Sequence, residues 1–394
     1  MKIFIIPSWY PSEAHPSTGI FFREQAVQLA ELRPEWKIGL SLWGSHEPKL
    51  WIQMKSPFSA LIKLNSRIPV KKHQQMLTSN CIEFFTPAFT WNRNIKSGNL
   101  DGILEAQEYN LRLFIQYYGK PDIIHAQVSF PAGYLAMKLS QRHGIPYVVT
   151  EHMSPFPMPS LRSAMKKYLL PALKQANLVL AVSNGLQDQL QSHGVKSELI
   201  NNFIDQKTFC FQPKAEGTYT FLAIGRLESQ KGYELLLNSA KELVIKNVYF
   251  RLRIGGSGSL ERSLKNQCKR LGLNDHVMWP GELSREEVKV ELTGCHCLVS
   301  TSYHENQPVA MLEALAVGRP VLTTAWEGSE ELILDEAIGK VIPNRDSKSF
   351  GEAMMEMIKK YDDPKVIASL FEKHFGTQKA VDDLEEKFRK VLTK

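Results

Sequence analysis

Short apolar, β-branched runs alternate with longer segments of helical periodicity along the whole chain. Such alternation is typical of α/β units that build parallel sheets. In the first half, the runs predicted as strands are Ile3–Ile6, Lys37–Ser41, Ile123–His125, Tyr147–Thr150, Leu178–Val182 and Ser197–Ile200. The segments predicted as helices are Phe21–Leu32, Leu100–Tyr118, Gly133–His143, Leu161–Gln175 and Gly185–Ser192.

A turn-rich stretch, residues 201–205, separates this series from a second one. The second series has predicted strands at Tyr219–Ile224, Phe250–Gly255, His276–Trp279, Cys297–Ser300, Pro320–Thr323 and Gly339–Val341. The pattern predicts an α/β protein with two Rossmann-like domains facing a cleft, residues 1–204 and 205–375. Residues 376–394 carry apolar positions at helical spacing and predict a closing helix.

Composition agrees with a soluble two-domain protein. The chain has 394 residues, 43% hydrophobic and 23% charged, which exceeds a typical single core. The first apolar run is too short for a signal peptide, and no stretch approaches the roughly 20 apolar residues of a membrane span. Five scattered cysteines indicate a reducing compartment, so we expect a cytoplasmic protein. Cys295-His296-Cys297 lacks a second cluster at zinc spacing, which favours core residues over a metal site.

Positive charge is concentrated in the N-terminal half. Residues 1–204 hold 21 Lys and Arg against 13 Asp and Glu, whereas the remainder holds 27 against 28. Residues 37–97 are especially basic and carry many aromatic side chains. Two interpretations stay open: contact with an anionic partner, such as a membrane surface or a phosphorylated acceptor, or an ordinary basic surface. No nucleic-acid-binding motif is present, so no nucleic-acid partner is expected.

The loop after Tyr219–Ile224 has the chemistry of a phosphate site. Gly225 permits a sharp turn at the carboxyl end of the strand, where ligands bind in open α/β sheets. Arg226 offers a planar fork to phosphate oxygens, and Lys231 offers a mobile point charge. A basic surface loop has the same composition, so this motif alone does not decide the function.

A glycine-rich turn ends the next predicted strand at residues 255–258. The three-glycine dinucleotide fingerprint is incomplete, because Glu261 stands where its third glycine would be. We interpret Gly256 as part of a tight turn that lets the backbone approach a diphosphate or a sugar.

Glu305 and Glu313 flank a predicted helix start. Pro308 suits the first helical turn, with Asn306 ahead of it as the expected cap. The free N–H groups expected at this start favour an anion such as a phosphate; they belong to Asn306, Gln307, Val309 and Ala310. The two glutamates then serve different parts of one ligand, or they are solvated residues of an amphipathic helix.

Read in order, these motifs resemble family 4 of the retaining glycosyltransferases. The set comprises Gly225–Gly232, the turn at 255–258, Trp279-Pro280-Gly281, the Glu-x7-Glu pair and Ala316–Val321. The resemblance extends over nearly the whole chain. It implies the GT-B architecture, with the donor nucleotide-sugar on the C-terminal domain, the acceptor mainly on the N-terminal domain, and a last helix that crosses back.

The resemblance also implies roles for these residues. Arg226 and Lys231 would hold the donor diphosphate and stabilise its growing charge, which leads us to expect turnover without a metal or another cofactor. Glu305 would orient the transferred sugar, and Glu313 would accept hydrogen bonds from the ribose hydroxyls. Retention is described for such enzymes as same-face attack, with the leaving phosphate taking the acceptor proton.

On the N-terminal side, the resemblance assigns three further residues. Gly19 matches the loop that reaches the donor phosphates, His125 matches a histidine that ends a strand, and His152 is matched to a contact with sugar or acceptor. Each histidine is equally well a hydrogen-bonded cleft residue without a chemical role. Two departures stand out: Gln127 replaces a second histidine found in many relatives, and residues 306–308 replace Gly-Phe-Gly.

We therefore expect a retaining transferase that moves a sugar from a UDP- or GDP-sugar to a hydroxyl of a saccharide acceptor. A lipid-linked saccharide in surface-polysaccharide synthesis fits the basic N-terminal half, with peripheral contact to an anionic membrane. Two alternatives remain at this stage: a non-hydrolysing nucleotide-sugar epimerase, and a catalytically silent nucleotide-sugar-binding protein, which Gln127 keeps open.

Overall fold

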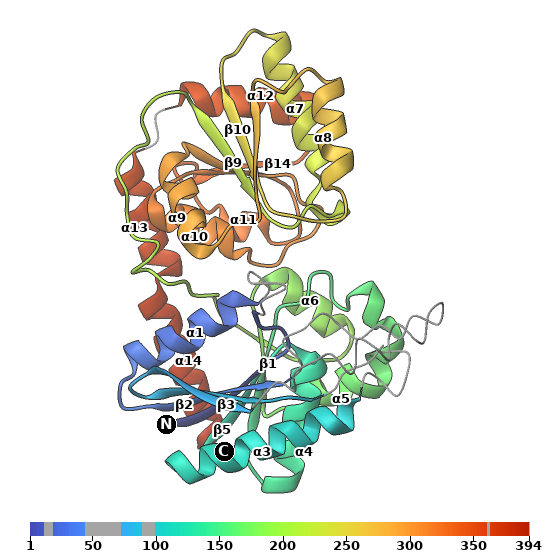
Figure 1. Cartoon of the computed structure of the whole chain (residues 1–394), viewed down its shortest axis with the longest axis vertical. Helices are drawn as coiled ribbons and strands as arrows, with labels where there is room; N and C mark the ends of the chain where they lie inside the picture. The colour runs from blue at the N-terminus through green and yellow to red at the C-terminus, as the bar shows by residue number, and fades with distance from the viewer. Residues whose placement is uncertain (12–18, 44–71, 89–98, 361–362, 394) are drawn as a thin grey trace.

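The computed structural model describes residues 1–11, 19–43, 72–88, 99–360 and 363–393. It consists of two α/β domains stacked along the long axis of the molecule, with the C-terminal domain above the N-terminal one in Figure 1. Each domain has a central sheet with helices packed against it, and the predicted fold class is confirmed.

The N-terminal sheet has eight described strands in the order β3-β4-β2-β1-β5-β6-β7-β8. All neighbouring pairs are parallel except the hairpin formed by β3 and β4. The strands are β1 (Lys2–Pro7), β2 (Lys37–Trp43), β3 (His73–Thr78), β4 (Cys81–Thr86), β5 (Ile123–Gln127), β6 (Tyr147–Glu151), β7 (Leu178–Ala181) and β8 (Glu198–Leu199). The inner strands are buried along nearly their whole length, as expected of a sheet covered on both faces.

Helices and short helical turns cover this sheet. The α-helices are α1 (Ile20–Leu32), α3 (Leu100–Tyr118), α4 (Tyr134–His143), α5 (Leu170–Lys174) and α6 (Asn184–Ser192). The short turns are a π-helical turn at Ser129–Gly133, a 3₁₀ segment at Pro159–Ala164 and a second π-helical turn at Met165–Leu169. Ser183 caps α6 by accepting a hydrogen bond from the Leu186 N–H, which satisfies one of the unpaired donors at that helix end.

The C-terminal sheet is parallel throughout its six described strands, in the order β11-β10-β9-β12-β13-β14. The strands are β9 (Thr220–Ile224), β10 (Arg251–Gly255), β11 (Val277–Gly281), β12 (Cys297–Ser300), β13 (Val321–Thr324) and β14 (Gly339–Ile342). The helices are α7 (Tyr233–Ile245), α8 (Glu261–Arg270), α9 (Arg285–Gly294), α10 (Val309–Val317), α11 (Ser329–Leu332), α12 (Ser347–Lys359) and α13 (Pro364–Phe375), with a 3₁₀ turn at Ser229–Lys231. The order reverses at β9, so the carboxyl ends of β9 and β12 open a crevice where ligands bind in such sheets.

The last helix, α14 (Thr377–Leu392), leaves the C-terminal domain and packs into the core of the N-terminal one (Figure 1). Phe388 is fully buried there, with its ring near those of Trp36 and His125. Arg33, just after α1, forms ion pairs with Asp382 and Glu385 of α14. The chain is thus tied twice across the domain boundary, once by the linker after β8 and once by α14.

Arg319 anchors that linker to the C-terminal domain. Its side chain is 2% exposed and donates hydrogen bonds to the carbonyl oxygens of Leu292, Thr293, Gln212 and Pro213. Because a buried guanidinium is costly unless its donors are paired, this arginine is best explained as a structural residue.

Two parts of the N-terminal half differ from the sequence prediction. The hairpin of β3 and β4 was not predicted, because β3 is a polar edge strand. Phe84 and Phe85 of β4, two aromatic residues of the basic segment 37–97, are buried. The helix predicted at Leu161–Gln175 is present, but it changes type along its length, from 3₁₀ at Pro159–Ala164 to π at Met165–Leu169 and α at Leu170–Lys174. Pro171 lacks the N–H that a continuous helix would use there. Most of the basic, aromatic segment lies outside the described residues.

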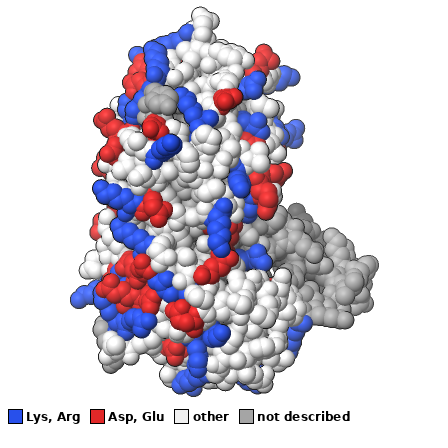
Figure 2. Space-filling model, turned by 90° about the vertical axis from the view of Figure 1, so that its left-hand side faces the viewer, with Lys and Arg blue, Asp and Glu red and all other residues white. Residues whose placement is uncertain are grey.

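Charges of both signs lie interspersed over both domains on the face shown in Figure 2. Among the described residues, no helix combines the length and the apolar character that crossing a membrane requires. Cys295 and Cys297 are fully buried, as predicted for core residues.

Candidate functional site

A cavity of about 390 Å³ lies between the two domains. The C-terminal domain contributes the carboxyl ends of β9 and β12, the loop before α10 and the first residues of that helix. The N-terminal domain contributes Phe21, His152, Ser154, Val182 and Asn202. Of the predicted site residues, those that line the cavity are Gly225, Arg226, Lys231, Glu305, Asn306, Gln307, Val309, Ala310 and His152.

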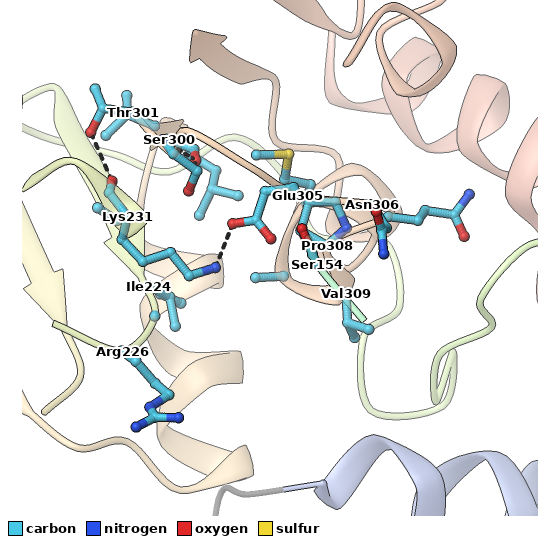
Figure 3. A pocket seen from close by; sticks show the side chains of 18 of the residues that line it. Ser154, Ile224, Arg226, Lys231, Ser300, Thr301, Glu305, Asn306, Pro308 and Val309 are labelled. Carbon is cyan, nitrogen blue, oxygen red and sulfur yellow. Dashed lines mark hydrogen bonds and ion pairs between the residues drawn. The ribbon is translucent and has the colours of Figure 1, made fainter. Parts of the chain in front are cut away.

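Lys231 and Glu305 form an ion pair inside this cavity (Figure 3). The two side chains are 26% and 11% exposed, so the pair is largely shielded from water. Thr301 holds the two loops together, because its hydroxyl hydrogen-bonds the carbonyl oxygens of Lys231 at 3.2 Å and Gly232 at 2.9 Å. A Cβ on Gly232 would lie 2.3 Å from the Thr301 carbonyl oxygen, so only glycine allows this approach.

Arg226 is the most accessible cation of the cavity. Its side chain is 82% exposed and lies 3.9 Å from Glu228, and Figure 3 shows it directed away from Glu305. It is therefore available to an incoming anion without the loss of a buried contact. Gly256 does not line the cavity, but it packs against its rim: a Cβ there would lie 1.9 Å from the Gly225 carbonyl oxygen.

The start of α10 differs in detail from the prediction. The helix begins at Val309 with Pro308 in the cap position, so the expected cap by Asn306 is wrong. The Asn306 side chain is used elsewhere, as a contact with the other domain. Val309 and Ala310 still place the beginning of the helix at the cavity, where its dipole favours an anion.

Asn306 and Gln307 connect the two domains. The Asn306 side-chain amide donates to the carbonyl oxygens of His152 at 3.2 Å and Met153 at 2.6 Å. The side-chain oxygen of Gln307 accepts a hydrogen bond from the Asn202 N–H, and its backbone carbonyl accepts one from the Asn202 side chain at 3.0 Å. Asn306 and Gln307 therefore fix the two domains relative to each other around the cavity.

His152 is half-buried and lies at the N-terminal wall of the cavity. Its Nε2 is 2.8 Å from Oε1 of Gln127, and its ring makes edge contacts with Phe21 and Phe22. Burial lowers the pKa of His152 to about 3, and the nearby His125 adds to the effect. Because Gln127 cannot titrate, this wall of the cavity is neutral over the physiological pH range.

His125 lies outside the cavity. It is 1% exposed, its Nε2 is 2.8 Å from the Thr150 hydroxyl, and its ring packs edge-on against Phe388 of α14. Burial lowers the pKa of His125 to about 3. This environment is that of a core histidine, and a direct contact with substrate would require rearrangement of the core.

Gly19 and Glu313 also lie outside the cavity lining. Gly19 precedes α1 with a φ of +69°, and a Cβ there would collide with the backbone of Trp9 and Tyr10. Glu313 lies just over one turn into α10, is 1% exposed, and forms an ion pair with Arg285.

Some residues at the site carried no recognisable sequence signal. The buried Ser154 hydroxyl finds no hydrogen-bond partner in the described part of the chain and is available to a ligand. Glu151 is fully buried and accepts hydrogen bonds from the N–H groups of Ser129, His152 and Met153, which shapes the loop that carries His152. Burial raises the pKa of Glu151. Neither role follows from spacing, because both depend on contacts between separate strand ends.

Comparison with known proteins identifies the class to which this fold and site belong. The model of the glycosyl transferases group 1 matches residues 205–393, and that of glycosyltransferase family 4 matches residues 91–208. Together the two models match residues 91–393, and the chain belongs to the glycosyltransferases that they describe.

Relatives by sequence carry similar names. An uncharacterized glycosyltransferase of Methanocaldococcus jannaschii is 25% identical over 66% of this chain and 73% of its own length. A putative colanic acid biosynthesis glycosyltransferase of Escherichia coli is 30% identical over 46% of this chain and 47% of its own length. A putative teichuronic acid biosynthesis glycosyltransferase of Bacillus subtilis is 24% identical over 84% of this chain and 83% of its own length.

Solved structures show the same fold. A sucrose-phosphate synthase of Thermosynechococcus elongatus superposes with a TM-score of 0.77 at 16% identity, over 100% of both chains. Anabaena HepE, solved in complex with UDP and glucose, superposes with a TM-score of 0.67 at 17% identity, over 99% of this chain and 100% of its own.

Proposed function

We propose that the protein transfers a sugar from a UDP- or GDP-sugar to a hydroxyl of a saccharide acceptor, with retention of anomeric configuration. The observation that carries the proposal is the grouping of Arg226, Lys231 and the start of α10 around one interdomain cavity, with Glu305 beside them. Two cations and a helix N-terminus form an anion site, and a carboxylate next to it suits a sugar hydroxyl.

The proposed chemistry needs charge stabilisation rather than an enzyme nucleophile. The bond between the anomeric carbon and the diphosphate oxygen breaks, while a bond from the acceptor oxygen forms on the same face. The leaving phosphate takes the acceptor proton. Arg226 and Lys231 stabilise the charge that grows on the diphosphate, which is usually the largest contribution to such a step.

Glu305 is proposed to accept a hydrogen bond from the transferred sugar. Glu305 is paired with Lys231, so the donor phosphate competes for the lysine and the sugar competes for the carboxylate. The pair thus keeps both charges satisfied until the donor enters. His152 and Ser154 face the same cavity from the N-terminal domain, on the side proposed for the acceptor.

We further propose that turnover requires no metal. The described residues contain no group of three or more His, Cys, Asp or Glu side chains arranged to hold an ion, and the two cations supply the charge that a divalent metal would otherwise provide. Turnover is expected to be unchanged after treatment with EDTA. A loss that Mg²⁺ or Mn²⁺ restores would contradict this part of the proposal.

The proposed acceptor is a lipid-linked saccharide of a surface polysaccharide. The names of the colanic acid and teichuronic acid relatives support this class. An alpha-monoglucosyldiacylglycerol synthase of Streptococcus pneumoniae, 25% identical over 55% of this chain, supports a lipid acceptor. Peripheral membrane contact from the cytoplasmic side would follow, and binding to anionic liposomes at low salt tests it. No binding would exclude that contact.

A donor panel tests the proposed function itself. UDP-, GDP- and ADP-sugars are first ranked by thermal shift, since binding to the folded state raises apparent stability. Release of nucleoside diphosphate is then measured for the wild type, Arg226→Ala, Lys231→Ala and a control, Lys269→Ala, whose side chain is exposed on α8. The first two variants should lose most turnover and the control none. Full turnover in Arg226→Ala and Lys231→Ala would overturn the proposal.

A further inference from the structure

Arg285 holds the buried carboxylate of Glu313. It is the first residue of α9, a helix whose start is fixed by a reciprocal capping box between Ser284 and Glu287. From there its guanidinium reaches α10 and donates to Oε1 of Glu313, which is 1% exposed. The capping box fixes the backbone from which this side chain extends.

The same guanidinium crosses the domain boundary. Its Nε donates to Oε1 of Glu24 at 2.6 Å, and its Nη2 donates to Oε2 of Glu24 at 2.9 Å. Glu24 belongs to α1 of the N-terminal domain. The ring of Phe209 covers the guanidinium, with its centroid 4.6 Å from the central carbon. One arginine therefore joins two carboxylates, one from each domain.

The helix that carries Glu24 is itself fastened to the interdomain linker. Gln25 donates to the side chain of Asn202 at 3.5 Å, and Gln28 donates to Asp205 at 3.2 Å. Gln28 lies one helical turn after Glu24, and Gln25 is the residue next to Glu24. Through Glu24, Arg285 therefore contacts a helix, α1, that is also hydrogen-bonded to the interdomain linker.

We propose that Arg285 is a positioning residue for donor binding: it orients the Glu313 carboxylate and, through Glu24, ties it to the N-terminal domain. The inference rests on the proposed function, in which Glu313 accepts hydrogen bonds from the donor ribose. A lysine could not replace all of this geometry. The guanidinium is planar and donates three hydrogen bonds in fixed directions, two to Glu24 and one to Glu313.

Glu313 needs this cation to serve as an anionic acceptor. Burial raises the pKa of Glu313 to about 7 even though Arg285, beside it, lowers that pKa. The other groups that face this cluster are Glu24, which raises the pKa of Glu313, and Asp205 and Arg23, which act on Glu24 in opposite directions. Without Arg285, the pKa of Glu313 would rise further, so the carboxyl group would be mostly protonated at neutral pH and a weaker acceptor for hydroxyl hydrogen bonds.

The test measures the affinity for the nucleoside diphosphate that stabilises the wild type most among UDP, GDP and ADP, between pH 6 and pH 9. Arg285→Met should weaken binding about tenfold or more at pH 7 and recover toward wild-type affinity as the pH rises and Glu313 ionises. Arg285→Lys keeps the positive charge but not the planar geometry, so it should lose less affinity at pH 7 than Arg285→Met and should show no recovery as the pH rises. The control is Lys289→Met on the same helix, which should bind like the wild type.

A second background separates positioning from simple structural damage. In Glu313→Gln, the further change Arg285→Met should have little additional effect, because the carboxylate that the arginine serves is gone. Glu24→Gln should not weaken nucleotide binding, because loss of the Glu24 charge lowers the pKa of Glu313, but it should lower kcat, because the contact with the N-terminal domain is lost.

Several outcomes would overturn the inference. Wild-type affinity and pH dependence in Arg285→Met would exclude a role through Glu313. An equal loss of affinity at every pH that also persists in the Glu313→Gln background would exclude it as well. Unchanged kcat in Glu24→Gln would exclude the tie between domains. If the wild type binds none of the three nucleotides, the proposed function fails, and the role of Arg285 fails with it. If the wild type binds a nucleotide and the variants bind it equally well, only the role of Arg285 is excluded.

Discussion

Asn306 donates a hydrogen bond from its side chain to the backbone carbonyl oxygen of His152, across the boundary between the two domains. The contact joins the loop that carries Glu305 to the loop that carries the proposed acceptor-side residues. A glycine at this position would have no such side chain.

Replacing Asn306 by alanine should therefore impair turnover more than donor binding. The carbonyl oxygens of His152 and Met153 would lose their partner, and an unsatisfied buried acceptor costs about 1–3 kcal/mol. Loss of alignment of about 1 Å lowers turnover on the order of a hundredfold, so kcat should fall by roughly tenfold to a hundredfold. Steady-state kinetics against Asn274→Ala, on an exposed turn, provides the comparison. Equal kcat values in both variants would show that the contact does not align the site.

The ion pair of Lys231 and Glu305 predicts strong coupling between the two residues. Lys231→Ala and Glu305→Gln should each lower kcat by about a hundredfold or more, the usual cost of removing a group that stabilises transition-state charge. The double variant should lose less than the product of the two single losses, because each single change already disrupts the pair. A double-mutant cycle of kcat measures this coupling. Strictly multiplicative losses would mean that the pair does not act as a unit.

The pH dependence of stability tests the burial of His125. Its pKa is about 3 in the folded protein and about 6.5 in an unfolded chain, so between these values only the unfolded state binds the proton. Stability from this group falls as the pH drops from about 6.5 to about 3, with a slope of about 1.4 kcal/mol per pH unit. Glu313 acts in the opposite direction, because its folded pKa is raised to about 7 and the protonated form gains stability as the pH falls from there.

Comparison of the wild type with His125→Asn isolates the histidine, since Glu313 is present in both. Urea denaturation at several pH values between 4 and 6 should give a shallower slope in the variant. Parallel slopes would mean that His125 is protonated in the folded protein.

Local sequence patterns predicted the strand and helix alternation well, because buried parallel strands such as Ile3–Ile6 and Ile123–His125 are continuous apolar runs. The local patterns gave wrong predictions where contacts between distant parts of the chain determine the structure. The polar strand β3 forms because it pairs with β4 at the edge of the sheet, and Asn306 does not cap α10 because it has partners in the other domain.

In the candidate site, too, residues placed by local features were predicted, and residues placed by tertiary contacts were not. Arg226, Lys231 and Glu305 were found from strand ends and helix starts, which are local features. Arg285 was not found, because its role depends on Glu24 and Glu313, which lie 261 and 28 residues away along the chain. The shielding of His125 by α14 likewise depends on a helix from the opposite end of the chain.

The most direct test of the central claim is the anomeric configuration of a glycoside that the protein forms. The preferred nucleotide-sugar is incubated with methanol as a simple hydroxyl acceptor, and the coupling constant of the anomeric proton in the methyl glycoside is measured by NMR. The account predicts a glycoside with the configuration of the donor, formed by the wild type and not by Lys231→Ala. An inverted glycoside, or epimerised nucleotide-sugar with no glycoside at all, would contradict it.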